Sequence, residues 1–172
     1  MDKRTLKTRT KLTNSYIELK LQDPGGVITV TEVCRHAGIN KSTFYRNYLD
    51  IDDLYNQFMQ EKVNELFNAK LLNTFFLNPE KCFLDIKEKL IATPSDVKRF
   101  LRLCTADYCT IAERTIKDAL KQCNRDQVNE VMLAFISGGV AHVVMSGFNS
   151  MDDVDELSRI VRYLAKNDQS KC

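Results

Sequence analysis

Few residues in this sequence of 172 could carry catalysis or hold a metal ion. The motifs G-x-S-x-G and H-E-x-x-H are missing, and so is a glycine-rich phosphate loop. The chain has two histidines, and His142 has no His, Cys or carboxylate at ligand spacing. None of the six cysteines forms a Cys-x-x-Cys pair. We therefore expect no enzyme activity, no cofactor and no metal site.

Long apolar runs and alternating strand patterns are also missing. No run is long enough to cross a membrane and no signal peptide is recognisable, so we expect a cytoplasmic protein without membrane contact. In that compartment the scattered cysteines are expected to be reduced thiols packed as small hydrophobic residues. Cys104 and Cys109, five residues apart, would suit redox sensing as the alternative. Without a strand pattern of useful length, the predicted fold class is all-α.

The most informative segment predicts two short helices joined at a glycine corner. Thr29 stands where an N-cap hydroxyl accepts a free amide, so a helix should begin at the next residue. Gly38 follows where a C′ residue takes a positive φ, so that helix should end there. Asn40 is expected to cap a second helix whose buried face is Phe44 and Tyr48. Two helices joined by a short glycine-containing turn predict a helix-turn-helix, which places its second helix in the major groove of DNA.

The side chains left exposed on the second helix are of the types that bind DNA. Lysine can donate to guanine, and serine and threonine can bond to several bases. Tyrosine, arginine and asparagine can hold phosphate oxygens, and the helix N-terminus adds partial positive charge. The alternative is the ordinary polar surface of a small helical hairpin. The candidate DNA-binding residues are Thr29, Asn40, Lys41, Ser42, Thr43, Tyr45, Arg46 and Asn47.

Positive charge is concentrated in the same part of the chain. Residues 1–48 carry nine Lys and Arg against four acids, which leaves sixteen bases and nineteen acids for residues 49–172. A basic N-terminal part on a mildly acidic remainder is expected where one end of a protein meets a polyanion. A basic amphipathic membrane anchor is the competing interpretation. We set it aside because the apolar face of the first helix, Leu12, Tyr16 and Leu19, is needed to cover the glycine corner.

Up to about residue 70 the chain resembles the amino-terminal domain of the TetR family of bacterial transcription regulators. The matching residues are Thr8, Arg9, Leu12, Ser15, Leu19, Ile28, Thr29, Val30, Val33, the run Ala37–Tyr45, Tyr48, Asp53 and Leu54. The resemblance implies that the third helix enters the groove, that Tyr45 touches the DNA backbone, and that dimers act on palindromic operators. The chain departs from the family at Ile51, where a lysine directed at a phosphate is usual. Asp50 and Asp53 are expected to form a capping-box-like pair at the start of a fourth helix.

The rest of the chain shows apolar residues at helical spacing, interrupted by Pro79, Pro94 and the polar stretch 149–153. This pattern predicts helices over 52–72, 80–90, 95–104, 106–123, 127–148 and from 154 to about 167. With the three N-terminal helices, about nine are expected. We expect a helix-turn-helix DNA-binding domain over 1–50 and a helical effector and dimerisation domain over 51–172.

The segment 127–148 is apolar on two sides. One side holds Val128, Val131, Met132, Phe135, Gly139 and Val143, and the other Leu133, Ile136, Val140 and Val144. Such a helix must be buried on both sides, and a second copy of the last two helices would do this as a four-helix bundle. Close backbone approach would offset the cost of the mid-helix glycines, for which a hinge or irregular helix is the alternative. The candidate dimer residues are Val131, Phe135, Gly138, Gly139, His142, Val143, Leu157, Val161 and Leu164.

These features predict a homodimeric, sequence-specific DNA-binding transcription regulator that recognises a palindromic operator. The resemblance favours a repressor that is released when a small effector binds the helical domain, and the sequence identifies no effector residues. The expected partners are double-stranded DNA and a second copy of the chain, with a small molecule or a protein as effector. Two alternatives stay open on the same fold. One is an adaptor that binds a partner protein, and the other is an activator whose helical domain docks a protein coactivator.

Overall fold

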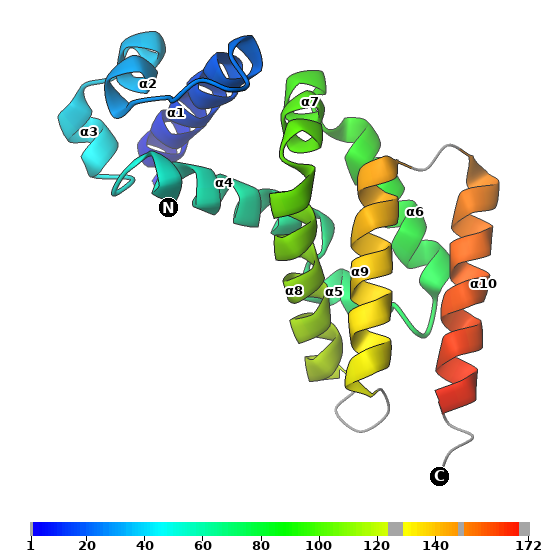
Figure 1. Cartoon of the computed structure of the whole chain (residues 1–172). Helices are drawn as coiled ribbons and strands as arrows, with labels where there is room; N and C mark the ends of the chain where they lie inside the picture. Colours follow the sequence, from blue (N-terminus) through cyan, green and yellow to red (C-terminus); the bar gives the residue numbers. More distant parts are fainter. Residues whose placement is uncertain (1, 124–128, 148–149, 169–172) are drawn as a thin grey trace. The chain divides into compact units, whose positions relative to one another are not determined.

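The described part of the chain is helical throughout. This computed structural model describes residues 2–123, 129–147 and 150–168, and within these ranges it contains helices and no strands (Figure 1). The helices are α1 (Lys3–Gln22), α2 (Val30–Ala37), α3 (Lys41–Tyr45), α4 (Ile51–Leu66), α5 (Ala69–Leu72), α6 (Pro79–Ala92), α7 (Ser95–Leu103), α8 (Thr105–Cys123), α9 (Glu130–Ser146) and α10 (Met151–Asp168). The predicted all-α fold class is confirmed.

The long helix predicted over 52–72 is interrupted in the structure. Helix α4 ends at Leu66, and the short helix α5 begins at Ala69. Asn68 explains the break, because its side-chain oxygen accepts the backbone N–H of Leu71 at 2.9 Å and so caps a new helix. The described residues therefore form ten helices where about nine were expected. Of the segment predicted as a helix over 127–148, residues 127, 128 and 148 lie outside the described ranges.

The chain divides into two compact units, which we describe separately. The N-terminal unit comprises Met1–Glu61 with Pro94–Cys104, and the C-terminal unit comprises Lys62–Thr93 with Thr105–Cys172. The division falls inside α4, whose residues up to Glu61 belong to the N-terminal unit. The functional domain limits expected from the sequence, 1–50 and 51–172, stay a prediction.

In the N-terminal unit the core joins α1 to the helical corner and to α7. Phe100 of α7 is completely buried, and its ring centroid lies 5.9 Å from that of Tyr16 in α1. A second edge-to-face contact, at 5.6 Å, joins Phe100 to Phe58 of α4. Such aromatic pairs add directional attraction to the burial of apolar surface. Helix α7 thus fixes the relative positions of α1 and the first part of α4.

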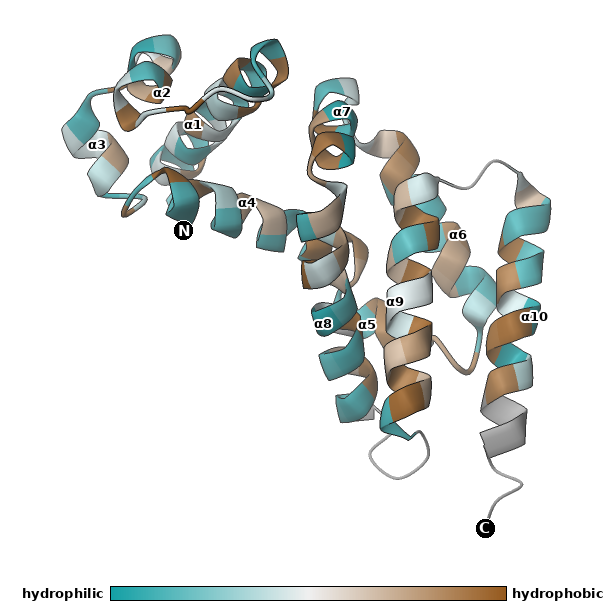
Figure 2. Ribbon diagram, in the orientation of Figure 1, coloured by the Kyte–Doolittle hydropathy of each residue, from teal (hydrophilic) through white to brown (hydrophobic). Residues whose placement is uncertain are grey.

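In the C-terminal unit, α8 packs along α9 and α10 packs against α6. The buried side of α9 is formed by Leu133, Ile136, Val140 and Val144, one of the two apolar sides expected from the sequence. Its opposite side stays hydrophobic but exposed, since Val131 is 80% and Phe135 69% exposed. Figure 2 shows hydrophobic residues on α9 toward the viewer. The subunit therefore covers one apolar side of α9 and leaves the other in solvent.

Candidate nucleic-acid interface

The helical corner begins with a reciprocal cap on α2. The hydroxyl oxygen of Thr29 accepts the backbone N–H of Glu32 at 3.3 Å, and the Glu32 carboxylate accepts the backbone N–H of Thr29 at 2.9 Å. The hydroxyl of Thr29 also donates to that carboxylate at 2.7 Å. These hydrogen bonds hold the pKa of Glu32 below its usual value. The predicted N-cap is confirmed, and Glu32 completes a capping box that the sequence analysis did not identify.

Gly38 turns the chain between the two helices. Its φ of 65° and ψ of 37° lie in the left-handed region. The N–H of Gly38 bonds to the carbonyl of Arg35 at 3.3 Å, and the N–H of Ile39 to that of Cys34 at 2.9 Å. This pair of bonds is the Schellman motif, which satisfies the last carbonyls of a helix. The positive φ predicted for Gly38 is confirmed.

Helix α3 is anchored by two aromatic side chains. Phe44 is completely buried and Tyr48 is 4% exposed, with their ring centroids 5.6 Å apart. The buried pair expected from the sequence is thus present. Because these residues face inward, the remaining side of α3 faces solvent.

The candidate DNA-binding residues lie on this outer side, with differences among them. Lys41, Ser42, Tyr45 and Arg46 are exposed, and Thr43 is half-buried. Thr29 is exposed but is occupied in the capping box of α2. Between positions 41 and 46, these side chains supply one ammonium group, two hydroxyls, a phenol and one guanidinium. These donors and acceptors match base edges and phosphate oxygens.

Two asparagines differ from what the sequence predicted. Asn40 occupies the N-cap position of α3 but its side chain makes no capping hydrogen bond, and its backbone carbonyl accepts the first bonds of the helix instead. Asn47 is half-buried, and its amide donates to the carbonyl of Thr43 at 2.8 Å. The Asn40 side chain is therefore available to a ligand, whereas one donor of Asn47 already serves its own helix.

The segment that follows α3 is acidic and well ordered by its own hydrogen bonds. The backbone N–H of Asp53 donates to the Asp50 carboxylate at 2.7 Å, and that of Leu49 donates to the Asp53 carboxylate at 2.8 Å. The predicted capping-box-like pair is confirmed. The bond from Leu49 is the main reason that the pKa of Asp53 is lowered. Half-buried Ile51 offers no positive charge at this point, and Leu49 is 80% exposed.

Two basic residues near the corner already have acidic partners. Arg9 pairs with Glu61 at 2.8 Å, and its side chain is only 17% exposed. His36 lies 3.6 Å from the carboxylate of Glu18 on α1. The exposed bases of the N-terminal unit are Lys3, Arg4, Lys7, Lys11, Arg35, Lys41 and Arg46, together with Arg99 and Arg102 of α7. Arg35, in the last turn of α2, is an exposed candidate for a phosphate contact that the sequence analysis did not single out.

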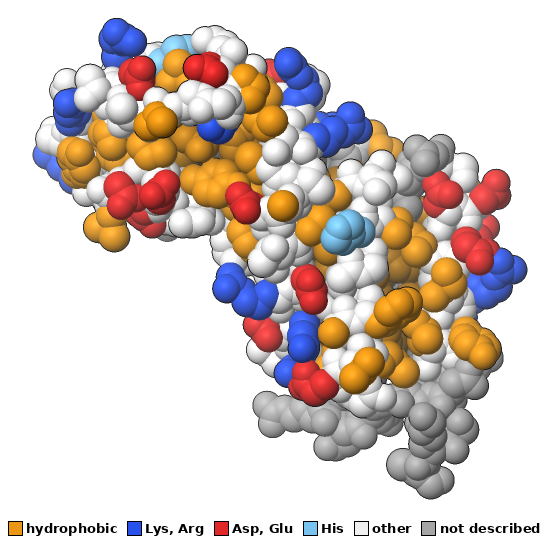
Figure 3. Space-filling view, viewed as in Figure 1, with side chains coloured by type: hydrophobic (Ala, Val, Ile, Leu, Met, Phe, Trp, Pro, Cys, Tyr) orange, Lys and Arg blue, Asp and Glu red, His pale blue; other side chains and the backbone are white. Residues whose placement is uncertain are grey.

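A second candidate surface lies on α9 and α10. Val131, Phe135, Gly139 and His142 are exposed, and the half-buried members of the predicted dimer set are Gly138, Val143, Leu157 and Leu164. Val161 is different, since it is 4% exposed and packs inside its own subunit. Ile160, 42% exposed, continues the line of Leu157 and Leu164 at helical spacing. We call these residues without Val161 the α9–α10 face, and Figure 3 shows hydrophobic side chains gathered there.

No contact among the described residues requires the two mid-helix glycines of α9. A Cβ added at Gly139 would meet no atom within 4 Å, and one at Gly138 would lie 3.8 Å from the Glu113 carboxylate, an ordinary contact. His142 is exposed, and its ring nitrogen Nδ1 donates to the carbonyl of Gly138 at 3.2 Å. The described residues of the subunit therefore leave room for a side chain at both positions.

The described cysteines lie mostly in the core. Cys34, Cys82 and Cys109 are buried, and burial raises the pKa of each thiol, that of Cys82 to about 12. A thiol with a raised pKa is a poor nucleophile, which argues against redox sensing by Cys109. Among residues 2–123, 129–147 and 150–168, no three His, Cys, Asp or Glu side chains are placed to hold a metal ion. No helix in these ranges is long and apolar enough to span a membrane.

Comparison with known proteins gave few matches. No family model matches the chain, and no curated protein matches it. Among solved structures, the dihydroxyacetone kinase operon activator DhaS is similar, with 13% sequence identity, 95% of each chain covered and a TM-score of 0.41.

Proposed function

We propose that this chain is a sequence-specific DNA-binding transcription regulator of the TetR type, with α3 as its recognition helix. The observation that carries the proposal is the outer side of α3, on which Lys41, Ser42, Tyr45 and Arg46 are exposed. Helix α3 follows α2 in the chain, and α2 ends at Gly38. Lys41 and Thr43 are assigned to base edges, and Tyr45 and Arg46 to phosphates. The concentration of positive charge in residues 1–48 supports a polyanionic partner.

A salt titration with single variants tests these roles. Wild-type protein should lose affinity for duplex DNA steeply as salt rises, because phosphate contacts release counterions. Arg46→Ala should weaken binding to all sequences and lower the slope by about 0.9 per contact. Lys41→Ala should mainly weaken binding to the preferred sequence. An equal loss on preferred and random DNA for Lys41→Ala would remove this residue from base recognition.

We further propose that the α9–α10 face binds a second copy of the chain and makes the regulator a homodimer. The stretch from Val131 to Gly147 contains no Asp, Glu, Lys or Arg, so its exposed part offers no charge that would select a charged partner. An isologous interface brings the same apolar patch from both copies together. Two α3 helices related by a two-fold axis would then meet half-sites about one helical turn of DNA apart.

The proposed dimer is tested by replacing the exposed Phe135 of α9 with a charged residue. Phe135→Lys removes two rings per dimer, which corresponds to about 2–4 kcal/mol and a roughly 30- to 1000-fold weaker dimer. Leu77→Lys is the matched control, because Leu77 is 84% exposed in the same unit but belongs to neither α9 nor α10. Sedimentation or light scattering over a concentration series measures the dissociation constant. Equal constants for the two variants would count against the α9–α10 face.

Regulation would follow from the two units and the helix that they share. An effector that prefers one arrangement of the C-terminal units shifts the population toward it, and α4 carries the change to the DNA-binding units. Repression, with release by a small molecule or a protein, is the mode we propose on the resemblance to the TetR family. The effector remains to be found by its effect on DNA affinity.

One observation favours a second candidate, an adaptor that binds a partner protein. The segment 49–53 contains three acids and no base, and its Leu49 side chain is 80% exposed. An exposed leucine beside acids fits a protein surface better than a phosphate backbone. An adaptor would show neither a preferred DNA sequence nor steep salt dependence. A coactivator-dependent activator would show both and would also bind a partner through its C-terminal unit.

A further inference from the structure

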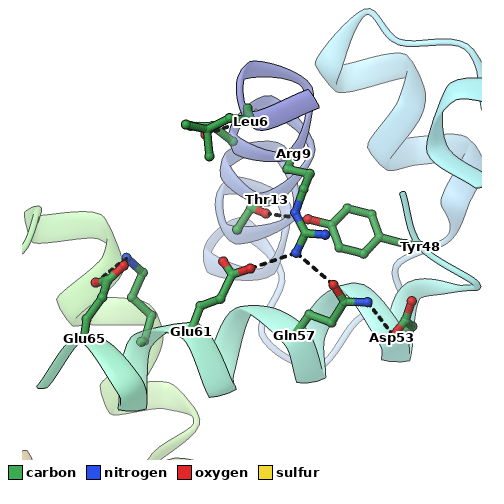
Figure 4. A network of polar contacts seen from close by, with 10 residues as sticks. Leu6, Arg9, Thr13, Tyr48, Asp53, Gln57, Glu61 and Glu65 are labelled. Carbon is green, nitrogen blue, oxygen red and sulfur yellow. Dashed lines mark hydrogen bonds and ion pairs between the residues drawn. The ribbon is translucent and has the colours of Figure 1, made fainter. Parts of the chain in front are cut away.

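We propose that Arg9 is a positioning residue that locks α3 to the stretch of α4 from Asp53 to Glu61, so that both move as one body. This inference rests on the proposed function, because it assigns to Arg9 the task of holding the recognition helix in place. The residues involved come from three places in the N-terminal unit: α1, the position just after α3, and α4 (Figure 4).

Arg9 is bound to two acceptors one helical turn apart on α4. Its terminal nitrogen Nη2 donates to the side-chain oxygen of Gln57 at 2.8 Å and to the carboxylate of Glu61 at 2.8 Å. Gln57 and Glu61 are four residues apart, so they lie on the same side of the helix. In the sequence, Arg9 is one of the nine basic residues that make residues 1–48 positively charged. The Arg9 side chain is only 17% exposed, and it already donates hydrogen bonds to Gln57 and Glu61. It therefore binds residues of its own unit.

The same guanidinium also contacts Tyr48, which follows the recognition helix α3 in the chain. Its central carbon lies 4.8 Å from the centroid of the Tyr48 ring, a cation–π contact. Tyr48 is 4% exposed, and its backbone N–H bonds to the carbonyl of Phe44 in α3 at 2.9 Å. Its hydroxyl lies 3.5 Å from that of Thr13 on α1. The position of Tyr48, and with it the end of α3, is therefore set against α1 and α4 together.

Gln57 connects Arg9 to Asp53 at the start of α4. Because its oxygen accepts from Arg9, its amide nitrogen is directed to the Asp53 carboxylate, to which it donates at 2.8 Å. Asp53 in turn accepts the backbone N–H of Leu49 at 2.8 Å. Figure 4 shows the contacts from Arg9 through Gln57 to Asp53, and the hydrogen bond from Leu49 to Asp53 continues this series to the chain that leaves α3. A change in the direction of α4 would move α3 with it.

This arrangement depends on arginine chemistry. The planar guanidinium stacks over a ring while its N–H groups donate in the same plane. A lysine would supply one compact ammonium, which cannot stack over Tyr48 and reach both acceptors in the same way. Arg9→Lys keeps the charge but should lose most of the positioning. Arg9→Met keeps the aliphatic part and loses all of these contacts.

The first experiment follows hydrogen exchange in the free protein. Arg9→Met should speed exchange of the backbone amide of Leu49, since Gln57 no longer holds its acceptor, the Asp53 carboxylate. Lys7→Met is the matched control, because it removes the same charge from an exposed position of α1. Exchange should stay at the wild-type rate in that control. Wild-type exchange rates in Arg9→Met would overturn the inference whether or not the protein binds DNA.

The second experiment measures the ratio of affinities for selected and random DNA, with thermal unfolding used to choose a temperature at which every variant is folded. Arg9→Met should lower this ratio about tenfold, the size of losing one base contact, with an unchanged salt slope. A loss of stability alone would weaken both affinities equally. Gln57→Met should lower the ratio too, and the double variant should lose less than the product of the single losses.

The outcomes separate the two proposals. An unchanged ratio, equal losses on both DNAs, or additive losses in the double variant would overturn the positioning role of Arg9. A salt slope reduced by about 0.9 would make Arg9 a direct phosphate contact and would also overturn it. If wild-type protein selects no DNA sequence, the proposed function fails, while exchange at Leu49 still decides whether Arg9 holds the start of α4.

Discussion

The glycine at the helical corner allows a prediction whose sign and size follow from the structure. Gly38→Ala adds a methyl group at a residue with φ of 65°. No atom lies within 4 Å of the added Cβ, so the cost does not come from a clash. It comes from the backbone, because an L-residue in the left-handed region is disfavoured by about 1–2 kcal/mol. Alanine also lowers the conformational entropy of the unfolded chain, which stabilises the folded state by about 0.4–1 kcal/mol. The net expectation is a loss of about 1 kcal/mol.

Two further variants isolate the backbone effect. Gly38→Asn should lose less than Gly38→Ala, since asparagine tolerates the left-handed region better. Gly25→Ala should be neutral or stabilising by up to about 1 kcal/mol, because Gly25 has no positive φ and a Cβ there also meets nothing within 4 Å. Urea unfolding followed by circular dichroism gives the free energies, provided that the slope m is equal across the series. If Gly38→Ala were as stable as Gly25→Ala, the backbone argument would be refuted.

Further predictions concern the caps and the core. Thr29→Ala should lower the free energy of unfolding by about 1 kcal/mol, measured by urea titration, because the capping box of α2 loses its hydroxyl. Because the folded pKa of Glu32 lies below its unfolded value, its stabilisation is complete above pH 5 or so and is lost as pH falls through the folded pKa, so the difference from Glu32→Gln should shrink in acid. Cys82, with a pKa of about 12, should react with iodoacetamide at neutral pH only after unfolding. Modification of Cys82 in the folded protein, detected by mass spectrometry, would contradict its burial. The hydroxyl of Tyr108 is buried without a hydrogen-bond partner among the described residues, so Tyr108→Phe should be neutral or stabilising by about 1–2 kcal/mol, and a clear loss of thermal stability would indicate a partner.

Local rules account for what the sequence predicted well. The cap at Thr29, the positive φ at Gly38 and the burial of Phe44 and Tyr48 each depend on residues no more than five positions apart. The Asp50–Asp53 pair is local in the same way. Rules of this kind need no knowledge of tertiary contacts. They predicted these features correctly, although the capping hydrogen bond expected from the Asn40 side chain is not formed. The end of α4 is also a local feature, but the capping role of Asn68 was hidden by the helical spacing of the apolar residues on both sides.

Contacts between distant segments account for what the sequence could not predict. The role of Arg9 could not be predicted because its acceptors, Gln57 and Glu61, are 48 and 52 residues away. Val161 was assigned to the outside of α10 because its neighbours inside the subunit depend on how α10 packs against α6. Likewise, the packing of Phe100 against Tyr16 cannot be read from either segment alone. Charge and hydrophobic periodicity describe one helix at a time. Which helices pack against one another is known only from the folded structure.

The most direct test of the central claim is selection from a pool of random duplex DNA, carried out in parallel with wild-type protein and Lys41→Ala. The account predicts that the wild type enriches a sequence with two-fold symmetry, and that Lys41→Ala enriches the same sequence with the preference lost at one position in each half-site. Failure of the wild type to enrich any symmetric sequence, or an identical consensus from the two proteins, would contradict the assignment of α3 as the recognition helix.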